Sequence, residues 1–442
     1  MSDVDHSYLS NGLPARTAAY KILCDVLLKN TPLDQIIATH PKITPLEPRD
    51  RNLARMIIMT ALRHKGQMDD IISRARDNAA DMRPEKIRIL LYVGITQLLF
   101  MDIPDHAAVD TTVELADQER LTRQKGLVNA ILRRTTREGQ KWLSEQDPVQ
   151  TNIPKYLLSA WVDDYGLSTA ADIAKASLNE AAMDITLKNP KDIEAMAEKL
   201  SAEILPSGSL RLKSAGDVTQ LDEFESGTWW VQDASAALPA KLLGDDLSGQ
   251  HIVDLCAAPG GKTAQIAAAG ATVTAVDRSA NRLKRLDENM KRLGLTESVQ
   301  TIVADGASWT PPEPVDAVLL DAPCSATGTI RRHPDVMHLK SETDINRLAA
   351  LQENLLNNMP NIIKSGGMLI YCTCSLQKKE GEDQVQKFLD KNPNFQTVPV
   401  KPEEVGSLEN VITPEGWLRV LPTNLPDQGG MDGFFAARLK KV

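Results

Sequence analysis

Short apolar runs alternate with amphipathic stretches from about residue 236 onward. The apolar runs predict strands over residues 252–255, 271–276, 299–303, 317–320, 368–371 and 433–439. The stretches between them predict helices, most clearly over residues 280–293, 344–363 and 382–389. Apolar strands separated by helices are typical of a parallel sheet covered on both faces. Residues 236–442 are therefore expected to form an α/β domain with a mostly parallel, Rossmann-like sheet.

The earlier part of the chain follows a different pattern. Apolar side chains recur at helical spacing through residues 14–140, and residues 87–100 are apolar on most faces, as in a central buried helix. Residues 1–140 are expected to form an all-helical bundle. Between residues 141 and 235, helical stretches alternate with short strand-like runs, which predicts a small α+β module. At 442 residues, a multidomain chain is also expected from length alone.

The charge distribution bears on possible partners. A net charge of −9 excludes a generally basic nucleic-acid coat protein but allows a local basic surface. Residues 120–141 hold seven basic side chains against one acidic one, and the densest group is Arg133, Arg134 and Arg137. This segment is the first candidate for contact with a polyanion. The alternative is an ordinary solvated helix face.

The sequence gives no sign of export or membrane insertion. Its first residues lack the basic and apolar regions of a signal peptide, and the most apolar stretch, residues 87–101, is interrupted by polar side chains and too short to span a bilayer. Five cysteines, an odd number, do not indicate a disulfide framework. A cytoplasmic location with reduced thiols is expected.

A glycine-rich turn follows the first strand of the α/β domain. The turn and its flanks read Asp-Leu-Cys-Ala-Ala-Pro-Gly-Gly-Lys-Thr over residues 254–263, and a helix is expected to follow. Strand, glycine-rich turn and helix together form the geometry that binds nucleotide-like cofactors. A phosphate-binding P-loop is disfavoured because that motif needs glycine where this chain has Cys256, and Pro259 lies inside the turn. The three-glycine dinucleotide fingerprint is also absent.

Four aspartates lie at the ends of consecutive predicted strands. They are Asp254, Asp277, Asp305 and Asp321. Because open α/β sheets bind ligands outside the carboxyl ends of their strands, these aspartates are expected at one ligand-binding edge. A carboxylate after the second strand can accept hydrogen bonds from ribose hydroxyls. A ligand with a ribose, an amine and a positive centre suits this edge, and S-adenosylmethionine has all three.

Two cysteines also follow strands of the predicted sheet. Cys324 lies just beyond the fourth strand, and Cys374 lies just beyond the fifth. Buried structural cysteines are the usual alternative, and they describe Cys24, Cys256 and Cys372. A zinc site is disfavoured because there is no Cys-x-x-Cys pair and His333 is the only histidine nearby in sequence. Two thiols at a ligand-binding edge instead indicate nucleophilic catalysis by a thiolate.

Several long motifs resemble those of the RNA cytosine-C5 methyltransferases. They are the glycine-rich turn, Leu-Asp-Ala-Pro-Cys-Ser-Ala-Thr-Gly (320–328), Arg-Arg-His-Pro-Asp (331–335), Thr-Cys-Ser (373–375) and Asp-Gly-Phe-Phe-Ala-Ala-Arg-Leu (432–439). Residues 105–110 and 125–134 resemble the NusB-like RNA-binding domain. A NusB-like domain joined to this catalytic domain is similar to the bacterial RsmB (Sun/Fmu) branch of the family, which methylates 16S ribosomal RNA. The resemblance covers nearly the whole chain and is thinnest over 141–235.

The resemblance implies a class I methyltransferase domain and a role for each matching residue. Cys374 matches the nucleophile that attacks carbon 6 of cytosine, Cys324 matches the thiol that helps release the product, and Asp321 is placed to stabilise the adduct near N3. The residues implied to bind S-adenosylmethionine are Cys256, Ala257, Ala258, Pro259, Gly260, Gly261, Lys262, Asp277, Asp305 and Asp321.

The resemblance also bears on partners. Arg331 and Arg332, close after Cys324, are expected to hold phosphates next to the target base. The implied substrate is 16S ribosomal RNA or a small-subunit precursor, with no metal, no membrane and no evident obligate protein partner. In one departure from the family pattern, Glu380 is followed by Gly381 rather than by asparagine.

Other functions are weighed against this one. A class I enzyme that methylates an exocyclic amine would more typically carry an Asn/Asp-Pro-Pro-aromatic motif, where this chain has Asp321-Ala-Pro-Cys. A DNA cytosine methylase would use the cysteine of the Pro-Cys pair and would not need Cys374. A cytosine-C5 enzyme of transfer RNA or 23S ribosomal RNA stays open. So does an RNA-binding ribosome assembly factor with little catalysis, although the intact cysteines disfavour it.

Overall fold

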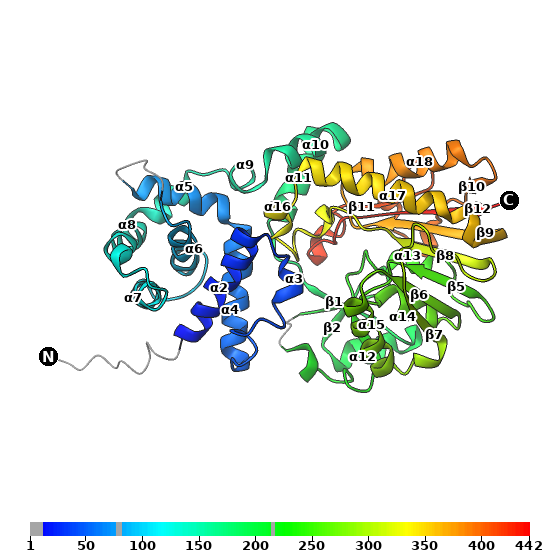
Figure 1. The fold of residues 1–442 in the computed structure, drawn as a ribbon, viewed down its shortest axis with the longest axis horizontal. Coiled ribbons are helices and arrows are strands. Elements are labelled where there is room, and N and C mark those ends of the chain that lie inside the picture. The colour runs from blue at the N-terminus through cyan, green and yellow to red at the C-terminus, as the bar shows by residue number, and fades with distance from the viewer. Residues whose placement is uncertain (1–11, 77–81, 214–216) are drawn as a thin grey trace. The chain divides into compact units, whose positions relative to one another are not determined.

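The computed structural model describes residues 12–76, 82–213 and 217–442, which form two compact units (Figure 1). One unit runs to Ser159 and includes His333–Leu339, and the other comprises Ala160–Arg332 and Lys340–Val442. Parts of the predicted domains, residues 1–11, 77–81 and 214–216, lie outside the described residues. Residue 140, the expected end of the helical domain, lies within a helix, and the compact helical unit continues to Ser159.

The first unit is a bundle of helices, as the hydrophobic spacing predicts. Its helices are α2 (Leu13–Lys29), α3 (Leu33–Ile36), α4 (Pro48–Arg63), α5 (Lys65–Ala75), α6 (Lys86–Leu99), α7 (Asp105–Gln118), α8 (Lys125–Ser144), α9 (Pro148–Asn152) and α16 (Val336–Leu339). α6 is buried on nearly all sides, which confirms the expected central helix. Proline begins α4, where its missing N–H removes no helical hydrogen bond.

A short segment from much later in the chain belongs to this helical unit. The Asp335 carboxylate accepts a hydrogen bond from the Leu33 amide at 3.0 Å. The ring Nε2 of His338 donates to the Leu62 carbonyl at 2.7 Å, and burial lowers the pKa of this histidine to about 4. A neutral His338 is therefore the form that anchors the segment around neutral pH.

The second unit begins with a small α+β module. α10 (Lys155–Tyr165) leads into it, and its other elements are α11 (Leu167–Ser177), β1 (Met183–Leu187), α12 (Ile193–Lys199), β2 (Ala202–Ile204), β3 (Leu210–Leu212) and β4 (Trp229–Val231). The strands form an antiparallel sheet in the order β2-β3-β1-β4. Trp229 is fully buried in the core of this sheet, so it packs the module together.

The larger sheet confirms the α/β prediction. Its strands are β5 (His251–Leu255), β6 (Thr272–Asp277), β7 (Val299–Val303), β8 (Val315–Asp321), β9 (Ile363–Thr373), β10 (Phe395–Thr397), β11 (Leu418–Val420) and β12 (Phe434–Lys441). The order is β10-β12-β9-β8-β5-β6-β7, with β11 paired to β12. The five strands from β5 to β9 are parallel to one another, and β12 pairs antiparallel with β9, β10 and β11.

Helices cover both faces of this sheet. They are α13 (Leu238–Lys241), α14 (Gly261–Ala268), α15 (Ala280–Leu293), α17 (Glu342–Ile362) and α18 (Glu382–Lys391). Figure 1 shows α17 and α18 on the face opposite α14 and α15. Successive β8 residues alternate between the two cores, with Leu319 on the α14 and α15 side and Val318 and Leu320 on the α17 side. This alternation follows from the two-residue period of a strand.

No helix among the described residues is both long enough and apolar enough to cross a lipid bilayer.

The small module depends on a buried ion pair between neighbouring strands. Arg211 on β3 donates to both carboxylate oxygens of Asp184 on β1, at 2.7 and 2.8 Å, and both side chains are almost fully buried. Removing Arg211 would leave the buried Asp184 carboxylate with Arg332, at the longer distance of 3.7 Å, as its remaining ion-pair partner, so most of its compensation would be lost.

We predict that Arg211→Met lowers the free energy of unfolding by about 3 kcal/mol, the usual cost of stranding one buried charge. The matched control is Arg347→Met, which breaks an exposed pair with Asp344 and should change stability by no more than about 0.5 kcal/mol. Urea unfolding followed by tryptophan fluorescence compares the two variants. Equal midpoints for both would contradict a structural role for the buried pair.

Candidate active site

The strand order of the large sheet reverses between β5 and β8. The chain runs outward from β5 through β6 to β7 on one side, and from β8 to β9 on the other. Such a switch point leaves a crevice outside the carboxyl ends of the strands. A cleft lies there with about 490 Å³ of empty space, including the solvent at its mouth. It is lined by Cys256, Val276, Asp277, Arg278, Arg282, Ala304, Asp305, Gly306, Pro323, Leu351 and Leu355.

The glycine-rich turn bends sharply at the end of β5. Cys256 adopts a left-handed backbone conformation with φ of 63°, and the amides of Cys256 and Ala257 both donate to the Val276 carbonyl, at 2.8 and 3.2 Å. Gly260 has φ of 101°, and a Cβ there would lie 2.7 Å from Leu286 Cγ. Only glycine fits this position, because the turn combines a positive φ with close packing against α15.

Two of the four predicted aspartates line the cleft. Asp277, at the end of β6, is 3% exposed, accepts a hydrogen bond from the Ser279 amide at 2.9 Å, and lies 3.3 Å from the Arg282 guanidinium. Asp305, after β7, is exposed and accepts a hydrogen bond from the Ala307 amide at 3.0 Å. Local bonds therefore orient both carboxylates at the ends of neighbouring strands.

The other two aspartates have different surroundings. Asp254 is fully buried, accepts a hydrogen bond from the Thr263 hydroxyl at the start of α14, and is absent from the cleft lining. Burial raises the pKa of Asp254 to about 7. Asp321, at the end of β8, accepts a hydrogen bond from Lys262 Nζ at 2.8 Å, and this ammonium lies 4.9 Å from the centre of the Phe434 ring.

Lys262 and Asp321 therefore form a charge pair, about one-tenth and one-third exposed respectively. Burial lowers the pKa of Lys262, but the Asp321 carboxylate and the nearby Cys372 and Cys374 together outweigh it, and the net pKa is raised. The resemblance implies that both residues belong to the cofactor site. The structure places them in contact with one another at the carboxyl edge of the sheet, and neither is among the residues that line the cleft.

The two predicted reactive cysteines lie side by side. Cys324 Sγ and Cys374 Sγ are 3.4 Å apart, and both side chains are partly exposed. Cys324 directly follows Pro323, which lines the cleft. Contact with Cys374 and burial both raise the pKa of Cys324 well above its ordinary value. Burial likewise raises the pKa of Cys372, whose thiol faces Asp321 at 3.7 Å, and raises that of Cys256 to about 12.

Backbone contacts hold the loop after Cys324 in place. The Gly328 amide donates to the Cys374 carbonyl at 2.9 Å, and the Gly433 amide donates to the Gly328 carbonyl at 2.8 Å. A Cβ on Gly328 would lie 2.0 Å from the Gly433 carbonyl oxygen, so a larger residue would separate these backbones. The loop of Cys324 is thus joined to the loops that follow β9 and precede β12.

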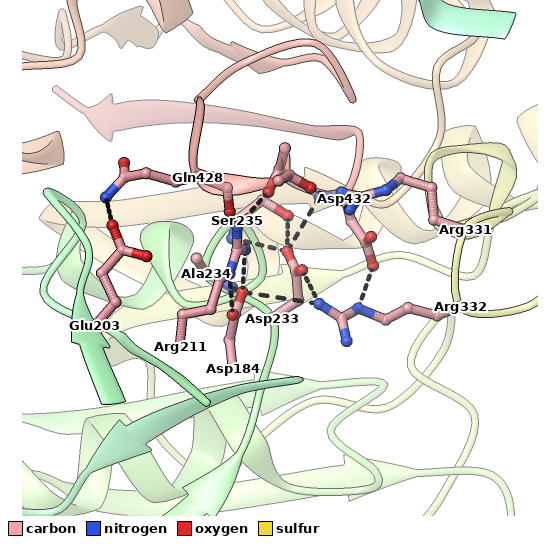
Figure 2. Close-up of polar contacts among 12 residues, drawn as sticks. Asp184, Glu203, Arg211, Asp233, Ala234, Ser235, Arg331, Arg332, Gln428 and Asp432 are labelled. Atoms are coloured by element: carbon pink, nitrogen blue, oxygen red, sulfur yellow. Dashed lines mark hydrogen bonds and ion pairs between the residues drawn. The ribbon is translucent and has the colours of Figure 1, made fainter. Parts of the chain in front are cut away.

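Arg331 and Arg332 do not lie where the sequence analysis expected them. Figure 2 shows Arg332 between Asp233 and Asp432, with its Nε 2.9 Å from an Asp432 oxygen. Arg331 is 2% exposed and donates to the Gly429 carbonyl. The Arg331 guanidinium is buried, and that of Arg332, about one-fifth exposed, is paired with carboxylates, so both are already engaged inside the protein rather than available to hold phosphates. We therefore revise the expectation: these arginines organise the loop after Cys324.

The predicted basic segment lies largely on α8 of the helical unit. Arg133, Arg137 and Lys141 are exposed and four residues apart, so they share one face of the helix. Arg134 differs: its guanidinium bonds Glu138 at 3.1 Å and lies 5.6 Å from the Trp142 ring. The candidate surface therefore consists of the three exposed side chains, and Arg134 packs along the helix.

Several residues of the cleft were not predicted from the sequence. Leu351 and Leu355 of α17 and Arg282 of α15 line it, although they belong to helices rather than to strand ends. The spacing of Leu351 and Leu355 marks an apolar helix face but does not distinguish a cleft wall from the core. Within the described part of the chain, no group of three or more His, Cys, Asp or Glu side chains is arranged to hold a metal ion.

Two family models match the chain. The model described as 16S rRNA methyltransferase RsmB/F matches residues 243–440, and the NusB family model matches residues 13–137. Among curated proteins, ribosomal RNA small subunit methyltransferase B of Pseudomonas putida is 34% identical, with 97% of this chain and 98% of the relative covered. The protein of the same name from Vibrio vulnificus is 34% identical over 96% of this chain and 99% of the relative.

Solved structures share the fold. The crystal structure of PH0851 covers 96% of this chain and 99% of its own, with a TM-score of 0.74 and 24% identity. The structure of NSun6 from Pyrococcus horikoshii, determined with SFG, covers 65% of this chain and 98% of its own, with a TM-score of 0.55 and 20% identity.

We predict that Asp277→Asn weakens binding of S-adenosylmethionine at least about tenfold, because a charge-assisted hydrogen bond contributes about 1.5–3 kcal/mol. Isothermal titration calorimetry measures the affinity, and the exposed Asp287 on α15 provides the control Asp287→Asn. An Asp277→Asn variant that binds as tightly as the control would remove this carboxylate from the cofactor site.

Proposed function

Because this chain belongs to the ribosomal RNA small subunit methyltransferase B family, we propose that it transfers a methyl group from S-adenosylmethionine to carbon 5 of a cytosine in 16S ribosomal RNA. The observation that carries the proposal is the pair of thiols 3.4 Å apart at the ends of β8 and β9, beside the cleft. A cytosine-C5 methyltransferase needs an attacking thiol, and a second group at the same place to complete release.

The cleft has the chemistry that S-adenosylmethionine requires. Asp277 offers carboxylate oxygens to ribose hydroxyls, Leu351 and Leu355 supply an apolar wall for the adenine ring, and Asp305 is an exposed acceptor on the rim. The bound cofactor supplies an electrophilic methyl group on a sulfonium. The residues of the chain orient it and keep the target base next to Pro323 and the two cysteines.

Cys374 is the proposed nucleophile. Its thiolate attacks carbon 6 of the cytosine and forms a carbon–sulfur bond, which makes carbon 5 electron-rich enough to accept the methyl group. The proton on carbon 5 must then leave, and the carbon–sulfur bond breaks to regenerate the thiolate. Cys324, in contact with Cys374, promotes this second stage directly or through water.

Asp321 is the proposed partner of the cytosine N3 edge. When carbon 6 is attacked, electron density moves onto N3, which takes up a proton from solvent, and the Asp321 carboxylate accepts a hydrogen bond from the resulting N3–H and so stabilises the adduct. Lys262 holds the Asp321 carboxylate at 2.8 Å, so the pair presents a fixed polar group at the end of β8. The target base must leave its stack to reach these groups, so an unpaired or flipped cytosine is the expected substrate.

The α8 face of Arg133, Arg137 and Lys141 is the proposed RNA-binding surface. Phosphate contacts position a nucleic acid without reading its sequence, which suits a helical unit that accompanies a catalytic one. The substrate is 16S ribosomal RNA or a small-subunit precursor, and the proposed location is therefore the cytoplasm.

Replacing each thiol tests the proposed chemistry. Cys374→Ala should abolish both methyl transfer and any covalent enzyme–RNA species, since the attacking group is gone. Cys324→Ala should still attack and methylate, then accumulate a covalent complex because release is blocked. Incubation with labelled S-adenosylmethionine and separate 16S, 23S and transfer RNA pools, followed by denaturing electrophoresis with and without RNase, measures both outcomes.

The double variant is the control, because a release defect requires prior attack and should produce no adduct. Adducts that persist in Cys374→Ala would assign the attack to Cys324 instead. Label that enters only 23S or transfer RNA would contradict the proposed substrate, and absence of label from all pools would favour an assembly factor over an enzyme.

The double substitution Arg133→Ala, Arg137→Ala should weaken RNA binding. The slope of the logarithm of the affinity against the logarithm of the salt concentration should become less steep by about 1.5, because each phosphate contact contributes about 0.7–0.9 to that slope. Cofactor affinity should not change. Fluorescence anisotropy across a salt series measures this, with Arg347→Ala as the control. A salt slope equal to that of the control would show that this face is only a solvated surface.

A further inference from the structure

A buried carboxylate connects the two cysteine loops. Glu380 is fully buried, and its Oε1 accepts hydrogen bonds from the Ser325 amide at 2.9 Å and from Gln352 Nε2 at 3.0 Å. Its Oε2 accepts bonds from the hydroxyls of Ser375, at 2.6 Å, and Ser325. Ser325 directly follows Cys324, and Ser375 directly follows Cys374. One side chain therefore bonds the immediate neighbour of each thiol.

Further buried polar contacts join the same two loops. The hydroxyls of Ser325 and Ser375 are 3.1 Å apart, and the Thr327 hydroxyl accepts a hydrogen bond from the Leu376 amide at 3.0 Å. The Tyr371 hydroxyl donates to the Glu380 carbonyl at 2.7 Å, which fixes the backbone of the glutamate itself. The pairing of β8 with β9 thus continues past the ends of the strands through side chains.

A neutral side chain of the same length could make these hydrogen bonds, so the bonds by themselves do not require the negative charge of Glu380. The neighbouring Glu382 pairs with Arg419, whereas no ion pair among the described residues includes Glu380. A buried carboxylate without a cation is costly. A glutamine could bond the same serine hydroxyls without that cost, because a hydroxyl both donates and accepts.

We propose that Glu380 is a positioning residue for the thiol pair: its carboxylate holds the two cysteine loops together, and its charge directs ionisation to Cys374 rather than to Cys324. Two of its four hydrogen bonds go to Ser325, so the charge is bound to the loop of Cys324. The proposal rests on the proposed function in one respect, the role of Cys374 as the attacking thiol.

Electrostatics agrees with this geometry. The pKa of Cys324 is raised by its contact with Cys374, by burial, and by the charges of Cys374 and Glu380. A carboxylate close to a thiol disfavours the thiolate because like charges repel. In a pair of thiols 3.4 Å apart, both cannot easily ionise, and a nearby fixed charge decides which one does.

The test is alkylation of the free enzyme by iodoacetamide, with mapping of the modified peptides over time. In the parent protein Cys374 should react first, because iodoacetamide reacts with thiolates. In Glu380→Gln the ratio of Cys324 to Cys374 modification should rise about tenfold, which corresponds to one pKa unit. Glu380→Asp, which keeps the charge, should restore the parent order. Glu353→Gln, at a partly exposed pair on α17, is the control.

A Glu380→Gln variant that binds S-adenosylmethionine normally and keeps the parent ratio would overturn the proposal. If this variant does not fold, the parent protein provides the second test through the pH dependence of alkylation. Cys374 should become reactive at a lower pH than Cys324, and equal pH dependence of the two cysteines would also overturn the proposal. Because alkylation requires neither RNA nor methyl transfer, its result is independent of whether the proposed function holds.

Discussion

The parallel pairing of β8 with β9 is the interaction on which the site depends. Asp321 lies opposite Cys372 in the register, so the residues that follow the two strands emerge at the same edge of the sheet. The pairing continues through the Ala322 amide, which donates to the Cys372 carbonyl at 2.9 Å. Cysteines fifty positions apart in the chain therefore meet without any covalent link. Parallel strands require a crossover connection, and α17 provides it while also forming a wall of the cleft.

Buried charges hold the loops around this edge. Arg332 reaches Asp233, Asp432 and, at 3.7 Å, Asp184, which itself pairs with Arg211 (Figure 2). The small antiparallel module is thereby linked to the loop that follows Cys324. Burial and the charge of Asp233 raise the pKa of Asp432 to about 7. Such a network tolerates little rearrangement, because each charge that loses its partner stays buried.

The elements and the motif positions were predictable from the sequence. The predicted strands and helices of the α/β domain lie where the alternation of apolar runs places them, although the short β10, β11 and α13 were not predicted, and the central helix α6 is buried as its composition indicates. These features depend on local patterns, which repeat every two residues in a strand and every 3.6 in a helix. The end of the compact helical unit, at Ser159 inside α10, depends instead on long-range contacts.

Local pattern also brings Asp254, Asp277, Asp305 and Asp321 to strand ends, but only the tertiary structure separates their surroundings. Two of these aspartates line the cleft, while Asp254 accepts a hydrogen bond from the buried hydroxyl of Thr263 and Asp321 pairs with Lys262. Arg332 likewise reads as a solvent-facing basic residue in the sequence, because its partner Asp432 lies a hundred positions away. A side chain's neighbours depend on which loops meet across the sheet, and that is a property of long-range packing rather than of the adjacent sequence.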